Sequence, residues 1–171
     1  MKKAIEVTVM QKFKLYPTII SLTVTLLTAV GGSLLTAVGA PTFNALQKVP
    51  FQPPGVVFGI AWSVIYLLTF LSAAFYFSAY APPEDKKGKT DAVAAVLYLL
   101  MAFFNILWVA TVFVLGEPTV GVFIILAYIF TVVLGICRTY KTVKLSTYLL
   151  IPHLAWLLFA LVLNYYLALI N

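Results

Sequence analysis

Five long apolar runs alternate with short polar breaks along the chain. They cover residues 15–39, 55–81, 92–115, 119–136 and 145–170. A helix needs about 20 apolar residues to cross the hydrocarbon core of a bilayer, and backbone polar groups in lipid must be satisfied within their own segment. The pattern therefore predicts an all-α polytopic membrane protein. We expect a five-transmembrane-helix bundle that forms a single domain over residues 1–171.

The first run follows a basic segment and ends near small residues, as a signal peptide would. The apolar part of a signal peptide is typically about 7–15 residues long, and this run is longer. We therefore expect it to be retained as a helix. Proline pairs flank the second run, at positions 53–54 and 82–83. Proline suits the first turn of a helix, where its missing N–H has no partner to lose.

Composition supports a lipid environment. Only 9% of the residues are charged and 63% are hydrophobic, whereas soluble domains carry roughly 25% charged residues. No acidic residue lies inside a run, which argues against a proton pump or a cation-driven transporter. The single cysteine, Cys137, excludes an intramolecular disulfide. Phosphate-binding loops, nucleophile elbows and metal-ligand spacings are absent, so we expect no metal site and no required cofactor.

Basic residues predict the orientation. Five spans place the N-terminus, the second loop and the fourth loop on one side of the bilayer. Ten of the 11 lysines and arginines belong to that side, and only Lys48 belongs to the other. The ten are Lys2, Lys3, Lys12, Lys14, Lys86, Lys87, Lys89, Arg138, Lys141 and Lys144. The positive-inside rule then makes the N-terminus cytoplasmic and the C-terminus external, and explains the net charge of +6 without a nucleic acid partner.

The three tryptophans, Trp62, Trp108 and Trp156, lie well inside the apolar runs rather than at the membrane interfaces. Polar or small residues share a helix face with them or continue it: Tyr66, Asn105, His153, Ala160 and Asn164. Polar groups in lipid usually face the protein interior, so these faces are expected to converge on one site. The alternative is that they serve as interhelical hydrogen bonds and core filling.

Three segments resemble motifs of one family. Residues 46–62 resemble "L-x-K-P-x-W-x-P-P-x-x-x-F-G-x-x-W", residues 98–113 resemble "Y…Q…LN-x-x-W…FF", and residues 152–165 resemble "P-Y-x-x-W-x-x-F-A-x-x-L-N". On these motifs the chain resembles the TspO/MBR family, the tryptophan-rich sensory proteins of prokaryotes and the mitochondrial translocator protein. It departs from the family pattern where the family has aromatic or polar residues, at Thr42, Phe43, Phe51, Met101 and His153. The arginine that ends the animal cholesterol motif is missing after Tyr165.

The resemblance implies a homodimeric bundle in a prokaryotic cytoplasmic membrane, with a pocket for porphyrins, haem or similar flat hydrophobic ligands. It implies a sensor or carrier whose pocket residues are Trp62, Asn105, Trp108, Trp156 and Ala160, with Phe43 and Phe51 as a lid. Two other functions stay open. One is a light-dependent porphyrin-degrading enzyme that uses Trp62 and Trp156 as electron donors, and the other is a structural or assembly subunit without a small ligand.

Two further features have alternative interpretations. His153 either hydrogen-bonds another helix or contacts a porphyrin carboxylate or haem iron, for which imidazole is a good ligand. Small residues let helix backbones approach closely, and they recur at Gly55 and Gly59 and at Ala95 and Ala102. We expect the glycines to serve packing within the chain, and the alanines to form the face of a dimer.

Overall fold

The computed structural model describes residues 14–80 and 91–171. These residues form helices α2 (Leu15–Ala45), α3 (Gly55–Tyr80), α4 (Ala92–Val109), the π-helix η1 (Ala110–Val114), α5 (Pro118–Tyr140) and α6 (Lys144–Ile170). Taking α4 and η1 as one span, five helices are long and apolar enough to cross a membrane, and no strand occurs within the described residues. The predicted five-helix membrane bundle is therefore confirmed. The predicted end of the second run at 81 and the six lysines before 14 and between 81 and 90 lie outside the described residues.

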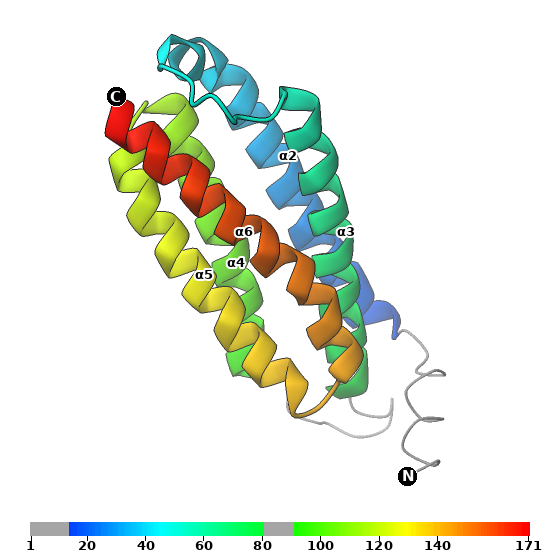
Figure 1. Cartoon of the computed structure of the whole chain (residues 1–171). Coiled ribbons are helices and arrows are strands. Elements are labelled where there is room, and N and C mark those ends of the chain that lie inside the picture. The colour runs from blue at the N-terminus through cyan, green and yellow to red at the C-terminus, as the bar shows by residue number, and fades with distance from the viewer. Residues whose placement is uncertain (1–13, 81–90) are drawn as a thin grey trace.

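The five spans stand side by side in a closed ring (Figure 1). Going round it, α2 contacts α3, α3 contacts α6, α6 contacts α5, α5 contacts α4, and α4 with η1 returns to α2. Lys14, Asp91 and Lys144 lie at the end of the bundle where the described chain starts, which we call the charged end. The opposite end carries the first loop and the C-terminus, and we call it the pocket end.

Two helices end later than predicted, the third run changes its winding, and the starts of α5 and α6 and the end of η1 each differ from the prediction by one residue. Helix α2 continues past residue 39 to Ala45 although it contains Pro41, because a single proline removes only one helix hydrogen bond. Helix α5 continues to Tyr140, four residues beyond the predicted end at 136. The third run changes from α-helix to π-helix at Ala110, where the Leu115 N–H donates to the Ala110 carbonyl over 3.0 Å. Hydrophobicity alone does not reveal such a change of winding, because every residue concerned is suited to lipid.

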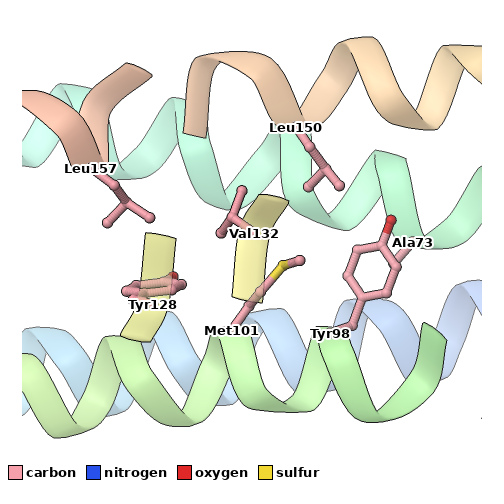
Figure 2. Close-up of a cluster of buried hydrophobic side chains, with 7 residues drawn as sticks. All are labelled: Ala73, Tyr98, Met101, Tyr128, Val132, Leu150 and Leu157. Carbon is pink, nitrogen blue, oxygen red and sulfur yellow. The ribbon is translucent and has the colours of Figure 1, made fainter. Parts of the chain in front are cut away.

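Side chains from four helices form the main apolar core, and Figure 2 shows them meeting between the ribbons. Met101, which stands where the family motif has glutamine, points into this core from α4 and is 1% exposed. It packs so closely on Gly135 that a Cβ added there would lie 2.4 Å from the Met101 Cε. The other members are Ala73, Tyr98, Tyr128, Val132, Leu150 and Leu157.

Glycines allow one very close helix contact and leave another face open. A Cβ added at Gly39 would lie 2.5 Å from the backbone carbon and oxygen of Phe113, so α2 touches the backbone of η1 there. By contrast, Gly55 and Gly59 are exposed, and nothing lies within 4 Å of a Cβ added at either one. The expectation that these two glycines serve packing within the chain is therefore wrong, because α3 turns them away from its neighbours.

At the charged end, the buried carboxylate of Asp91 links three helices. Asp91 caps α4 by accepting a bond from the Ala94 N–H over 3.2 Å. The same side chain accepts bonds from the Tyr76 hydroxyl over 2.6 Å and from the Arg138 Nε over 2.8 Å. These partners, with the Arg138 bond as the largest effect, lower the pKa of Asp91 to about 2. Asp91 therefore ties α3, α4 and α5 together as a charged group.

Candidate ligand-binding site

Trp62 stands where α3, α4 and α6 meet. Its ring lies 5.7 Å from the Tyr66 ring and 6.2 Å from the Trp108 ring, measured between centroids. The His153 ring stands edge-on to it, also at 6.2 Å. These distances are typical of interacting aromatic pairs. Three of the helix faces that the sequence singled out therefore converge, as expected, with Trp62 at their centre.

Asn105 and Asn164 hold two of these aromatic side chains by hydrogen bonds. The Tyr66 hydroxyl donates to the Asn105 Oδ1 over 2.9 Å, and the Trp108 Nε1 donates to the Asn164 Oδ1 over 3.1 Å. The Asn164 Nδ2 in turn donates to the Pro118 carbonyl over 2.6 Å. Both asparagines are almost fully buried. They fix the orientation of the two rings, and Asn164 also ties α6 to the start of α5.

His153 is buried and makes one hydrogen bond, between its Nδ1 and the Thr69 Oγ1 over 3.2 Å. Its ring also stands edge-on to Tyr128, with the centroids 5.2 Å apart. Its second nitrogen, Nε2, has no hydrogen-bond partner among the described residues, and neither has the Asn105 Nδ2. A buried polar atom without a partner is costly. Both atoms are therefore suited to bind a group that the protein itself does not supply.

A pocket opens beside Trp108 at the pocket end, between the first loop, η1 and α6. Ala160 and Asn164 line it together with residues that the sequence analysis did not select: Gln52, Phe58, Val112, Phe113, Leu163 and Leu167. Phe43 closes one wall, with its ring stacked on the Phe113 ring at 4.1 Å and an interplanar angle of 16°. Phe43, which we expected to act as a lid, thus lines this pocket, and its role as a lid stays a prediction. All of the lining residues that the sequence analysis did not select, except Leu167, fall inside the segments that resemble the family motifs, and those segments are the signal that could have found them.

Several of the expected site residues do not line this pocket: Trp62, Tyr66, Asn105 and His153 form the group around Trp62 described above, and Phe51 and Trp156 lie elsewhere. Phe51 is 47% exposed and places its ring edge-on to Tyr166 at 5.4 Å, so it does not cover the pocket with Phe43. Trp156 is half-buried between Phe58 and Phe159, at 5.6 and 5.3 Å. It stands behind Phe58, which itself lines the pocket. Its Nε1 is buried and has no hydrogen-bond partner in the described structure. Spacing along α6 correctly grouped Trp156 with His153, but the bundle turns only His153 fully inward.

The first loop is held over this site by the C-terminal residue. The Gln47 N–H donates to the Asn171 Oδ1 over 2.8 Å, and the Asn171 Nδ2 donates back to the Gln47 carbonyl over 3.2 Å. Within the described residues no group of three or more His, Cys, Asp or Glu side chains is placed to hold a metal ion. The site is thus a small cavity lined by aromatic and amide side chains, and a larger molecule would have to displace a lining side chain such as Phe43 to enter it.

Together, the bundle and this pocket define a five-helix integral membrane protein with a tryptophan-walled site between its helices. The model of the TspO/MBR family matches residues 19–170, and the chain belongs to that family.

Three relatives, each called tryptophan-rich protein TspO, are similar along most of their length. The protein of Archaeoglobus fulgidus is 34% identical over 141 residues, which cover 82% of this chain and 87% of the relative. The protein of Chlorobaculum tepidum is 29% identical over 72% of this chain and 75% of its own. The protein of Bacillus cereus is 28% identical over 81% and 86%.

Proposed function

We propose that the protein binds porphyrins or similar flat hydrophobic molecules in the pocket beside Trp108 and acts as a membrane sensor or carrier. One observation carries the proposal: aromatic walls stand next to buried hydrogen-bond atoms that no described side chain satisfies. Trp108 and Phe113 line the pocket and offer ring faces and edges to a flat ligand, and the Trp62 ring lies 6.2 Å from the Trp108 ring. His153, whose ring stands edge-on to Trp62, and Asn105, which accepts the bond from Tyr66, each offer a nitrogen atom without a partner among the described residues.

The stacking of Phe43 on Phe113 supports the same proposal. Two rings 4.1 Å apart and nearly parallel occupy the site that a flat ligand would use. A ligand ring that slides between them replaces one aromatic contact with two. Phe43 belongs to the last turns of α2 and packs against the second apolar cluster, which includes Trp108 and Val112, so its new ring contacts must offset the packing that it loses.

A porphyrin titration of the protein in lipid nanodiscs tests the proposal. We expect a saturable shift of the absorption band of protoporphyrin. Replacing Trp62 by alanine should weaken binding about tenfold, because a base-sized ring contact is worth roughly 1–3 kcal/mol. Phe123→Ala is the matched control, since Phe123 is an aromatic residue that is 68% exposed on α5. A shift that does not saturate, or equal affinities for both variants, would refute the proposal.

Illumination during the same titration separates a carrier from an enzyme. The Trp62 and Trp108 rings, 6.2 Å apart, are suited to pass an electron to a photoexcited ligand. Progressive loss of the porphyrin band in light, lost in Trp62→Phe and absent in the dark, would favour the degrading enzyme. A band that stays constant under light is the result expected for a sensor or carrier.

We also propose that the charged end faces the cytoplasm of a prokaryotic cell, which places the pocket on the external side. The described cations support this, because Lys14, Arg138, Lys141 and Lys144 gather at that end and Lys48 lies at the other. A thiol-reactive label tests the orientation, with single cysteines placed at position 48 or 141 of a Cys137→Ser background. A membrane-impermeant reagent should label only position 48 in intact cells.

Homodimer formation is a further part of the proposal. Ala95 and Ala102 lie on α4 and are half-buried within the bundle, so part of each surface stays available to a second copy. Replacing both by phenylalanine should lower the oligomer mass in detergent. If the mass is unchanged, the face formed by these alanines is not the interface, and the exposed face around Gly55 and Gly59 is the next to test.

A further inference from the structure

Lys48 brings a positive charge to the edge of the pocket. Its Nζ donates a hydrogen bond to the Phe43 carbonyl, close to the end of α2. The same Nζ stands 3.6 Å above the centroid of the Phe43 ring, well within the distance of a cation–π contact. Phe43 in turn lines the pocket. The cation is therefore in direct contact with the side chain that closes the proposed ligand site.

Within residues 14–80 and 91–171, no carboxylate lies within 4.0 Å of the Lys48 ammonium, and the ion pair found there is Arg138 with Asp91 at the charged end. Lys48 is an exposed residue, and the limited burial of its ammonium group lowers its pKa, since it withdraws some water from the charged form. A partly desolvated cation without a counter-ion attracts an anion more strongly than a fully hydrated one does. The Lys48 ammonium can therefore form an ion pair with an anionic group of a ligand.

The contacts of Phe43 connect this charge to the interior of the pocket. The Phe43 ring stacks on Phe113 at 4.1 Å, and the Phe113 ring stands edge-on to Trp108 at 6.0 Å. The order from solvent to core is thus ammonium, lid ring, pocket ring and buried tryptophan. A flat ligand that displaces the lid ring would meet the ammonium with its outer edge while its body contacts Phe113 and Trp108.

We propose that Lys48 binds an anionic group on the outer edge of the ligand, so that the pocket selects flat apolar molecules that carry a carboxylate there. This inference rests on the proposed function, because it concerns the same pocket. It predicts that one edge of the ligand is negatively charged, a property that the apolar walls of the pocket do not require. The aromatic walls recognise the body of the ligand, and Lys48 recognises its charge.

The alternative is a purely structural role for Lys48, and the test must distinguish this role from anion binding. Its bond to the Phe43 carbonyl and its contact with the Phe43 ring could simply hold the lid in place. A lid function would affect charged and uncharged ligands alike. Recognition of an anion would affect only the charged ligand, and it would weaken as salt screens the interaction.

The experiment compares protoporphyrin, which carries two carboxylates, with its dimethyl ester, which has the same ring and no charge. Both are titrated into nanodiscs of uncharged lipid that contain the wild type, Lys48→Gln or Lys48→Arg. Lys144→Gln is the matched control, because Lys144 is also a lysine near an aromatic ring, with its Nζ 5.7 Å from the Tyr140 centroid, but lies at the opposite end. The ratio of the two affinities in each variant cancels the different partitioning of the two porphyrins into lipid.

We expect Lys48→Gln to lower the acid-to-ester affinity ratio about fivefold, the size of an ion pair near a protein surface. Lys48→Arg and Lys144→Gln should keep the wild-type ratio, and raising the salt concentration should lower it only where position 48 is charged. An unchanged ratio in Lys48→Gln, or equal weakening of both porphyrins, overturns the inference while leaving the pocket intact. If neither porphyrin binds the wild type saturably, the proposed function itself fails and the inference falls with it.

Discussion

The charged end of the bundle is held by hydrogen bonds around a charged carboxylate, whereas the pocket end combines aromatic ring contacts with the amide hydrogen bonds of Asn164 and Asn171. At the charged end Asp91 bonds Tyr76 and Arg138. Nearby, the Ser72 and Tyr98 hydroxyls lie 2.6 Å apart and those of Thr139 and Thr147 2.9 Å apart. At the pocket end the corresponding contacts are the stack of Phe43 on Phe113 and the contact of Trp62 with Trp108.

The difference matters because lipid provides no hydrophobic driving force between helices. Close packing and hydrogen bonds must then hold the bundle together. A hydrogen bond between two particular side chains cannot be replaced by an arbitrary ligand, so the charged end stays closed. A ring contact can be replaced by another flat ring at little cost. If the protein binds a flat ligand as we propose, we therefore expect the ligand to enter at the pocket end.

The largest expected effect comes from separating α2 from η1 at the pocket end. Gly39→Ala would place a Cβ 2.5 Å from backbone atoms of Phe113, which cannot move as a side-chain tip would. Overpacking of this kind costs about 1–3 kcal/mol, and we expect the melting temperature in detergent to fall by roughly 3–10 °C. Gly59→Ala is the control, because its Cβ meets nothing within 4 Å. Equal melting temperatures for the two variants would contradict the close contact.

The charged end can be weakened through its carboxylate. Asp91→Ala removes the acceptor for Tyr76, Arg138 and the Ala94 N–H, and we expect it to lower stability by about 2 kcal/mol. The control is Glu117→Ala, since Glu117 precedes α5 without a side-chain capping bond. Thermal melts of both variants in one detergent measure the difference. The pocket lies at the other end, so porphyrin affinity should stay the same in folded Asp91→Ala protein.

Acid should loosen the same end selectively. The pKa of Asp91 falls from 3.8 to about 2 in the folded protein. A lowered carboxyl pKa stabilises the fold above the unfolded value, and this stabilisation is lost as the pH falls from about 4 toward 2. The melting temperature of the wild type should therefore drop over this window more than that of Asp91→Asn. Parallel pH profiles for the two proteins would show that Asp91 does not contribute in this way.

The smallest expected effect is on ligand affinity and concerns His153, which lies deeper in the bundle. His153 uses its Nδ1 for Thr69 and leaves its Nε2 without a partner in the described structure, which suits a bond to iron. If the imidazole ligates haem, His153→Phe should weaken haem binding at least about tenfold, since even the loss of a group that only supports a metal ligand costs roughly 10–100-fold. The binding of metal-free protoporphyrin should weaken much less. Absorption titrations with both ligands measure this. Equal weakening would leave His153 a hydrogen-bonding role, and no effect on either would make it purely structural.

Much of the candidate site followed from the spacing of residues along each helix. Trp62 with Tyr66, and Asn105 with Trp108, share a helix face because three or four residues complete about one turn, and the bundle does bring these faces together. The same reasoning failed for Trp156. One face of α6 is wide enough that His153 points into the bundle while Trp156, on the edge of that face, is only half-buried. It also failed for Phe51, whose position depends on the path of a loop that has no periodicity.

The sequence by itself determined the number of membrane spans, their approximate ends and the placement of the described cations. These depend on lengths of apolar residues and on loop charges, and both act locally along the chain. Only the tertiary structure decided which helices are neighbours, that Gly39 rests on the backbone of Phe113, and that Lys48 lies against the ring closing the pocket. Such contacts join residues far apart in sequence, and they depend on how the helices pack and rotate against one another. In a chain that is apolar on every helix face, the hydrophobic pattern carries little information about that rotation.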